Sequence, residues 1–261
     1  MRIADCHAHI FPDKIAPKAS AAIGDFYDKP SNHDATFDIL SQQEAAADIE
    51  YFLASSSATV EAQVEHINDF IAETTSSSDH VIGFGSLYPT MKNWEPELER
   101  IQALGIRGIK IHSDFQKINI DEPRAVEMYR GIAKAGLPVM FHMGDFRYDY
   151  SAPERLVNLL RQVPDLIVIA AHYGGWRTWE RSSVLDMPEN VYYDTSSSLM
   201  YMGKELGQEL LYKMGPHRFL FGTDFPMWTP KTELERFLEL DLDETTRDRI
   251  LFGNFETLFI K

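Results

Sequence analysis

The chain has 261 residues, a length at which one barrel-type domain or two smaller domains can form. A hydrophobic fraction of 44% and a charged fraction of 25% are ordinary for a globular protein, and the net charge of −15 argues against nucleic acid or an anionic membrane as partner. We find no apolar run long enough to span a membrane and no signal peptide, and the single cysteine excludes an internal disulfide, so we expect a cytoplasmic protein.

Candidate strands and helices alternate along the chain. Most strand candidates are continuous apolar runs, which is typical of parallel strands buried on both faces. Amphipathic stretches at 94–104, 123–135, 153–162 and 204–214 predict helices between them. The strand candidates lie at residues 2–8, 49–55, 81–87, 106–112, 138–142, 166–171, 191–195 and 218–223.

The later strand ends recur about every 30 residues, a spacing that favours a (β/α)₈ TIM barrel forming a single domain over residues 1–261. A doubly wound open sheet would explain the alternation equally well, but no glycine-rich dinucleotide loop follows the first strand. The connection over residues 10–48 exceeds the usual loop length, so we expect either a lid over the site or an excursion that packs on another subunit.

Histidines and an aspartate stand where several predicted strands end. Strand alternation places Asp5, His7 and His9 on one face of the first strand, with Ala4, Cys6 and Ala8 on the other. Because the carboxyl ends of barrel strands converge on one face, all the strand-end groups would meet there. Taken singly, His142 or His172 could be a hydrogen-bonded core histidine and Asp224 a turn residue. Together, these strand-end groups predict a metal site built from His7, His9, His142, His172 and Asp224.

Six segments in this order resemble the amidohydrolase superfamily. The resemblance is to its amidohydrolase-related branch, which includes aminocarboxymuconate-semialdehyde decarboxylase, γ-resorcylate decarboxylase and several lactonases. It extends from the first strand to the last helix and is specific for fold and superfamily, and much less specific for substrate. The segments are Asp5-Cys-His-Ala-His-Ile-Phe-Pro12, Gly108-Ile-Lys-Ile-His112, Phe141-His142, Ala171-His172, Leu220-Phe-Gly-Thr-Asp-Phe-Pro226 and Ile250-Leu-Phe-Gly-Asn-Phe255.

The resemblance implies that His7, His9, His142 and Asp224 ligate a divalent metal, with zinc expected and manganese as an alternative. Three imidazoles and one carboxylate leave a coordination position for water, as in catalytic zinc sites. Asp224 would accept the proton of that water, and His172 would lie beside it. We expect one metal ion; the alternative is a second ion held by His172 and a carboxylated Lys110.

The predicted activity is metal-dependent hydrolysis of a small cyclic ester, lactone or amide-type carbonyl compound. The alternative is zinc-dependent, non-oxidative decarboxylation of an unsaturated or aromatic carboxylic acid, and a third reading is a metal-binding protein without catalysis. The expected partner is a small molecule, with a homodimer as a further possibility. Expected substrate contacts are Lys110, His112, Arg147, Trp176 and Arg177, the arginines being suited to bind a carboxylate.

Overall fold

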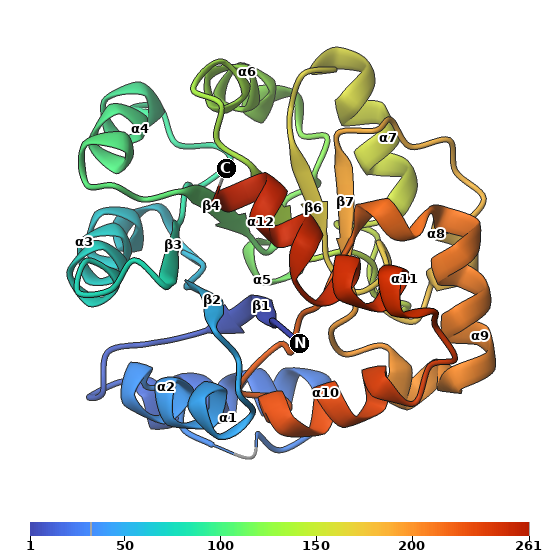
Figure 1. Ribbon diagram of the computed structural model, residues 1–261. Helices are drawn as coiled ribbons and strands as arrows, with labels where there is room; N and C mark the ends of the chain where they lie inside the picture. Colours follow the sequence, from blue (N-terminus) through green and yellow to red (C-terminus); the bar gives the residue numbers. More distant parts are fainter. Residues whose placement is uncertain (32, 261) are drawn as a thin grey trace.

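The computed structural model describes residues 1–31 and 33–260. Within these residues, eight parallel strands form one sheet whose spatial order equals their order in the sequence (Figure 1). The predicted alternation of strands with helices is confirmed. The strands are β1 (Ala4–His9), β2 (Tyr51–Ser55), β3 (Val81–Gly85), β4 (Gly108–Ile111), β5 (Val139–Phe141), β6 (Val168–Ala170), β7 (Val191–Asp194) and β8 (Phe219–Leu220).

Backbone hydrogen bonds between β1 and the segment that follows β8 close the sheet into a barrel. Cys6 N donates to Phe221 O at 2.9 Å, His9 N donates to Phe225 O at 2.8 Å, and Asp224 N donates to His7 O at 2.7 Å. This closure confirms the TIM barrel and excludes the open sheet. It also brings Asp224 next to the histidines of β1, although more than two hundred residues separate them in the sequence.

The alternation expected for β1 is interrupted. The pairing of β1 with β2 shifts register between Asp5 and Ala8, as at a β-bulge. As a result, Cys6 packs with Ala4 in the apolar cluster that also contains Leu220, whereas Ala8 belongs to the larger cluster. The prediction that Asp5, His7 and His9 simply share one face is therefore corrected, because a bulge changes the phase of the strand.

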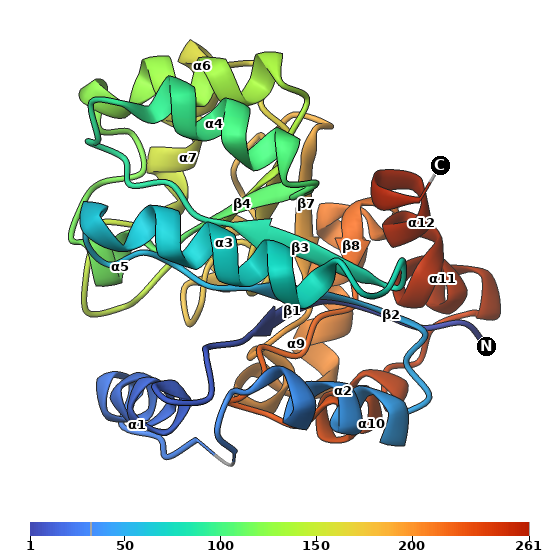
Figure 2. The same cartoon turned by 90° about the vertical axis from the view of Figure 1, so that its left-hand side faces the viewer.

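Helices occupy the connections, and the two ends of the barrel differ. Figure 2 shows α1 and α5 at one end, whereas α11, α12 and both termini lie at the other. No helix within the described residues is long and apolar enough to cross a membrane. The helices are α1 (Ala16–Tyr27), α2 (Phe37–Ala46), α3 (Val64–Thr75), α4 (Trp94–Ala103), α5 (Ser113–Gln116), α6 (Val126–Lys134), α7 (Pro153–Gln162), α8 (Trp179–Ser182), α9 (Leu199–Met214), α10 (Pro230–Leu238), α11 (Glu244–Asp248) and α12 (Asn254–Phe259), with shorter turns at Glu61–Gln63, Pro123–Ala125, Pro216–Arg218 and Arg249–Gly253.

The four predicted helices are present with small differences at their ends. The stretch 204–214 is the C-terminal part of α9, which has a kink at Gly203 where φ is +74°. The long connection over residues 10–48 contains α1 and α2. At the end with the chain termini, Phe252, Phe255 and Phe259 pack against the apolar interior. The polar side chains of the candidate site, described below, lie at the opposite end of the barrel, where the strands have their carboxyl ends.

Candidate metal centre

Three polar atoms at the ends of β1 and β8 face one another at distances that suit a single metal ion. The distance is 3.2 Å from His7 Nε2 to His9 Nε2, 3.2 Å from His9 Nε2 to Asp224 Oδ1, and 3.6 Å from His7 Nε2 to Asp224 Oδ1. Ligand atoms about 2.0–2.1 Å from a tetrahedral zinc ion lie about 3.3 Å from one another. His7, His9 and Asp224 thus form a group that fits a zinc-sized ion.

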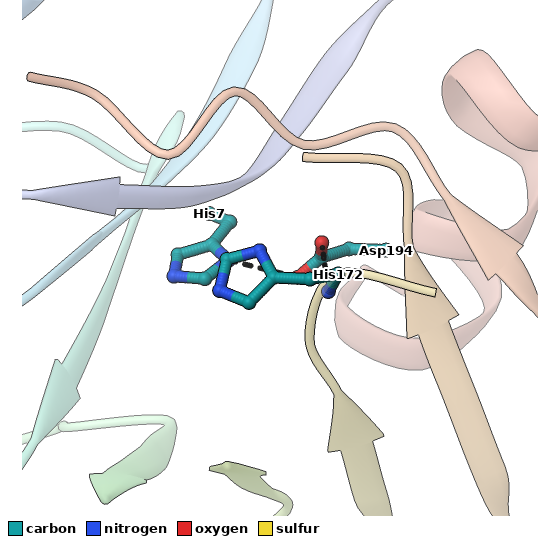
Figure 3. A group of neighbouring side chains, drawn as sticks. All are labelled: His7, His172 and Asp194. Atoms are coloured by element: carbon teal, nitrogen blue, oxygen red, sulfur yellow. Dashed lines mark hydrogen bonds and ion pairs between the residues drawn. The ribbon is translucent and has the colours of Figure 1, made fainter. Parts of the chain in front are cut away.

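The hydrogen bonds of the two histidines leave unshared electron pairs on these Nε2 atoms. His7 Nδ1 donates to Asp194 Oδ2 at 2.8 Å (Figure 3). Ser55 Oγ donates to the Ala8 carbonyl, so it accepts from His9 Nδ1 at 3.3 Å. A neutral imidazole carries one proton, and both protons are therefore on Nδ1. Two electron pairs and a carboxylate facing one another repel, unless a cation lies between them.

Asp224 is held as a hydrogen-bond acceptor. The Trp228 indole N–H donates to Ser197 Oγ at 2.9 Å, which directs the Ser197 hydroxyl proton to Asp224 Oδ2 at 2.5 Å. Burial acts to raise the pKa of Asp224, but the histidines that surround it, His9 first among them, outweigh burial and hold that pKa well below its usual value. Burial, with the charge of Lys110, lowers the pKa of His7 to about 3. The site therefore presents neutral imidazoles and an ionised carboxylate.

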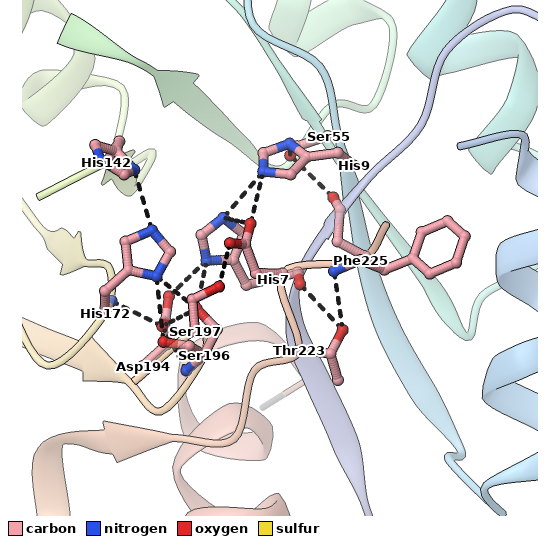
Figure 4. A network of polar contacts seen from close by, with 12 residues as sticks. His7, His9, Ser55, His142, His172, Asp194, Ser196, Ser197, Thr223 and Phe225 are labelled. Atoms are coloured by element: carbon pink, nitrogen blue, oxygen red, sulfur yellow. Dashed lines mark hydrogen bonds and ion pairs between the residues drawn. The ribbon is translucent and has the colours of Figure 1, made fainter. Parts of the chain in front are cut away.

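His142 and His172 form a second pair of facing nitrogen atoms (Figure 4). His142 Nδ1 lies 3.0 Å from His172 Nε2, and the ring of His172 stacks on that of His7 with centroids 5.1 Å apart. Ser196 Oγ donates to Asp194, so His172 Nδ1 donates to Ser196 and its Nε2 faces His142. His142 does not join the close group of His7, His9 and Asp224, and its part as a ligand to that same ion stays a prediction.

Lys110 is fully buried beside the first group. Its Nζ lies 2.9 Å from His7 Nε2, and burial lowers the pKa of the amine to about 8. The amine can therefore donate to the unshared pair of His7 Nε2 when no metal is bound. This contact joins Lys110 to the first group, and a part for a carboxylated Lys110 in holding a second ion stays a prediction.

A cavity of about 350 Å³ opens beside these groups. His9, His112, His142 and Asp224 supply its polar end. Among the described residues that line it, the exposed Lys117 is the one cationic side chain. Most of the wall is apolar. Ala19, Ala22, Ile23 and Phe26 come from α1, and Phe11, Phe115 and Met227 come from other segments.

The residues predicted to contact the substrate differ in whether they line a cavity. His112 lines this cavity, and Trp176 lines a smaller neighbouring one. Arg147 lines neither cavity, because its guanidinium donates to both oxygens of Asp145 at 2.9 and 2.7 Å and to the Phe26 carbonyl at 2.6 Å. Arg177 also lies outside both linings, over the aromatic rings of Phe146 and Tyr201 at the rim. Substrate binding by the two arginines thus has no support from this arrangement.

Tyr27 is a site residue that the sequence did not reveal. Its hydroxyl lies 3.0 Å from His112 Nε2 and 3.3 Å from His142 Nε2, and its side chain lines both cavities. It belongs to the connection over residues 10–48, where no strand end marks a position of interest. Nothing in the sequence pattern around Tyr27 distinguishes it from the aromatic residues Phe11 and Phe26.

Solved structures with this fold cover almost the whole chain. The 5-carboxyvanillate decarboxylase of Sphingomonas paucimobilis is 15% identical with a TM-score of 0.76, the match covering 99% of this chain and 98% of that chain. A dihydroxybenzoic acid decarboxylase of a Polaromonas species, with bound manganese and the inhibitor 2-nitroresorcinol, is 17% identical with a TM-score of 0.74, covering 99% and 96%. A probable 2-pyrone-4,6-dicarboxylic acid hydrolase of Acinetobacter baumannii is 17% identical with a TM-score of 0.72, covering 99% of each chain.

At these identities, the likeness establishes the shared fold alone. No curated protein matches the chain significantly in sequence. The amidohydrolase family model, in contrast, matches residues 4–259, which is nearly the whole described chain. The protein is therefore a member of the amidohydrolase family, with its barrel and its strand-end histidines in the order that the motifs predict.

Proposed function

We propose that this protein is a metal-dependent hydrolase of a small cyclic ester, lactone or amide-type carbonyl compound. The observation that carries the proposal is the position of Asp224. Its Oδ1 faces His7 and His9, its Oδ2 accepts from Ser197, and its side chain lines the apolar cavity. An ionised carboxylate at this boundary can take a proton from water as the water attacks a carbonyl carbon.

The donor set suits zinc, and we propose one zinc ion per chain with His7, His9 and Asp224 among its ligands. When bound, a divalent ion supplies a Lewis acid and lowers the pKa of water. Asp194 and Ser55 hold the imidazoles in the tautomer that such an ion requires. Asp224 then passes the proton to the leaving oxygen or nitrogen, and His172 Nε2, which carries an unshared electron pair, can accept a hydrogen bond on the same side.

The cavity supports a small substrate that carries little charge. Its wall is apolar, no arginine is among its described lining residues, and its size suits a molecule with one ring. The cationic side chain among the described lining residues is the exposed Lys117, so a second substrate carboxylate deeper in the cavity would lie against Phe26 and Phe115 without a cationic partner. Burial of an unpaired charge is costly, so we expect dicarboxylic acids to be poor substrates.

Decarboxylation of an aromatic or unsaturated acid is the second candidate. It is favoured by the aromatic wall of Phe26, Tyr27 and Phe115, which suits a flat ring, and by the decarboxylases among the structural neighbours. In that reaction the bond from the ring carbon to the carboxyl carbon breaks, carbon dioxide leaves, and a proton that Asp224 or His172 first takes up from water passes to the ring carbon. The same ligands serve either reaction.

A paired assay of zinc-loaded protein separates the two reactions. One panel holds single-ring lactones and cyclic amides and is followed by acid release; the other holds hydroxybenzoates and is followed by carbon dioxide release. We expect lactone opening without carbon loss. Carbon dioxide release from the second panel, with no opening of the first, would replace hydrolysis by decarboxylation. Metal analysis in the same preparation is expected to give one ion per chain, whereas two ions and a carboxylated Lys110 by mass spectrometry would contradict the single-ion proposal.

A further inference from the structure

The Tyr27 hydroxyl lies between two histidine nitrogens, and neither has an unshared pair with which to accept its proton. His112 Nδ1 accepts from the Phe115 backbone N–H, which places the ring proton of His112 on Nε2, the atom 3.0 Å from the Tyr27 oxygen. His142 Nε2 donates to the Gly144 carbonyl at 3.1 Å and lies 3.3 Å from the Tyr27 oxygen. The Tyr27 oxygen therefore accepts from His112, and neither nitrogen can accept the hydroxyl proton of Tyr27.

The hydroxyl proton of Tyr27 is left without an acceptor in the contacts of the described chain. A phenol group both accepts and donates, and neither neighbouring nitrogen has an unshared pair to offer. The side chain lines the cavity together with His9 and Asp224, and the direction that remains open to the proton is the cavity. Burial raises the pKa of the Tyr27 hydroxyl well above its usual value, which keeps the proton in place at neutral pH.

The chain around Tyr27 holds this side chain in position. Tyr27 is the last residue of α1, and the chain then folds back so closely that a Cβ on Gly24 would lie 2.8 Å from the Lys29 carbonyl oxygen. Arg147 binds the Phe26 carbonyl and lies over the ring of Phe26, 4.6 Å from its centroid. The ring of Tyr27 also meets Trp176 edge to face, with centroids 5.1 Å apart. The hydroxyl is thus fixed before any ligand arrives.

We propose that the Tyr27 hydroxyl donates a hydrogen bond to an oxygen atom of the bound substrate, so that α1 supplies a substrate-binding residue to the metal centre. The inference rests on the proposed function only in requiring a ring compound that carries oxygen. In hydrolysis the acceptor is the carbonyl oxygen as it gains negative charge; in decarboxylation it is a ring hydroxyl or carboxylate oxygen. Preorganised donors of this kind stabilise developing charge.

The test compares Tyr27→Phe with Tyr148→Phe in full-length, manganese-loaded protein. Phenylalanine keeps the ring of Tyr27 and removes the donor; Tyr148 is a matched control because it stacks on Phe26 from the exposed rim and does not line the cavity. Binding of 2-nitroresorcinol is titrated by its visible absorption, and opening of single-ring lactones is assayed in parallel. Metal content and thermal midpoint verify that each variant is folded and loaded.

We expect Tyr27→Phe to weaken 2-nitroresorcinol binding, and to lower kcat/KM for any lactone turned over, by roughly 10-fold or more, the size of a hydrogen bond to a charged oxygen. Tyr148→Phe is expected to stay within about 2-fold of wild type, since surface changes have small effects. Equal binding by Tyr27→Phe and wild type would overturn the proposal, as would failure of wild type to bind the probe and to open any lactone. Weakened probe binding without turnover of any panel compound would refute the proposed reaction while supporting the Tyr27 contact.

Discussion

The two sides of the cavity are built in opposite ways. On the barrel side, His7, His9 and Asp224 stand at strand ends, largely buried, and each is oriented by a polar partner. On the other side, α1 contributes mostly apolar side chains from a connection outside the repeating strand and helix units. This difference supports the proposal that the barrel supplies the reacting groups, whereas the connection over residues 10–48 selects the compound that reaches them.

The largest effect is expected from Asp224→Asn on the barrel side. The amide is neutral and cannot take a proton from water, so turnover of the active panel should fall at least about 1,000-fold, with loss of bound metal. Turnover and metal content after dialysis are measured beside Asp165→Asn, an exposed carboxylate in the loop before β6. Full turnover and full metal content in Asp224→Asn would contradict the proposal that this barrel-side carboxylate takes part in catalysis and metal binding.

His172→Asn distinguishes a proton-handling residue from a metal ligand. We expect turnover to fall about 100- to 10,000-fold, as for a general acid or base, with the metal content unchanged at one ion per chain. The measurement is turnover together with metal analysis on the same sample. A drop from two ions to one would instead assign His172 to a second metal position, and unaltered turnover would exclude both roles.

A smaller effect, on metal affinity, is expected from Asp194, which contacts the expected metal ligand His7. Asp194 accepts from His7 Nδ1 and from the His172 backbone N–H, so Asp194→Asn weakens the preference of His7 for its present tautomer. Outer partners of this kind typically contribute 10- to 100-fold in metal affinity, and we expect a loss in that range by chelator competition. Unchanged affinity would mean that His7 Nε2 is not a metal ligand.

Lys110 gives a pH-dependent prediction for metal-free protein. Its pKa is lowered from 10.5 to about 8, so between pH 8 and pH 10.5 the folded chain loses this proton while the unfolded chain keeps it. The unfolding free energy of wild type should therefore rise with pH in this window relative to Lys110→Met, by about 2–3 kcal/mol. Urea unfolding of both proteins after chelation measures the difference, and a difference that is constant over the window would contradict a buried, titrating amine.

The smallest effect is expected on the α1 side. Arg147→Met removes the donors to the Phe26 carbonyl and to the buried Asp145 carboxylate, and the loss of partners for a buried acceptor costs about 1–3 kcal/mol. We expect faster proteolysis within residues 10–48 and a KM increase below about 10-fold with kcat unchanged. Arg161→Met, at an exposed position of α7, is the control. A fall in kcat without a change in KM would instead give Arg147 a part in the reaction.

The sequence predicts the barrel side better than the α1 side, for a physical reason. All parallel strands of a barrel end at one face, so the sequence alone predicts that strand-end residues such as His7, His9 and Asp224 lie close together. No such rule applies to a long connection, so the sequence does not identify Tyr27 as a site residue. Arg147 shows a related limit: the sequence reveals a cation after β5, but not that its guanidinium turns back onto Asp145.

The most direct test of the metal centre is diffraction from crystals of zinc-loaded protein at energies on both sides of the zinc absorption edge. We expect one anomalous peak about 2.0–2.2 Å from His7 Nε2, His9 Nε2 and Asp224 Oδ1. A peak elsewhere, or none at full zinc loading of the crystal, would contradict it.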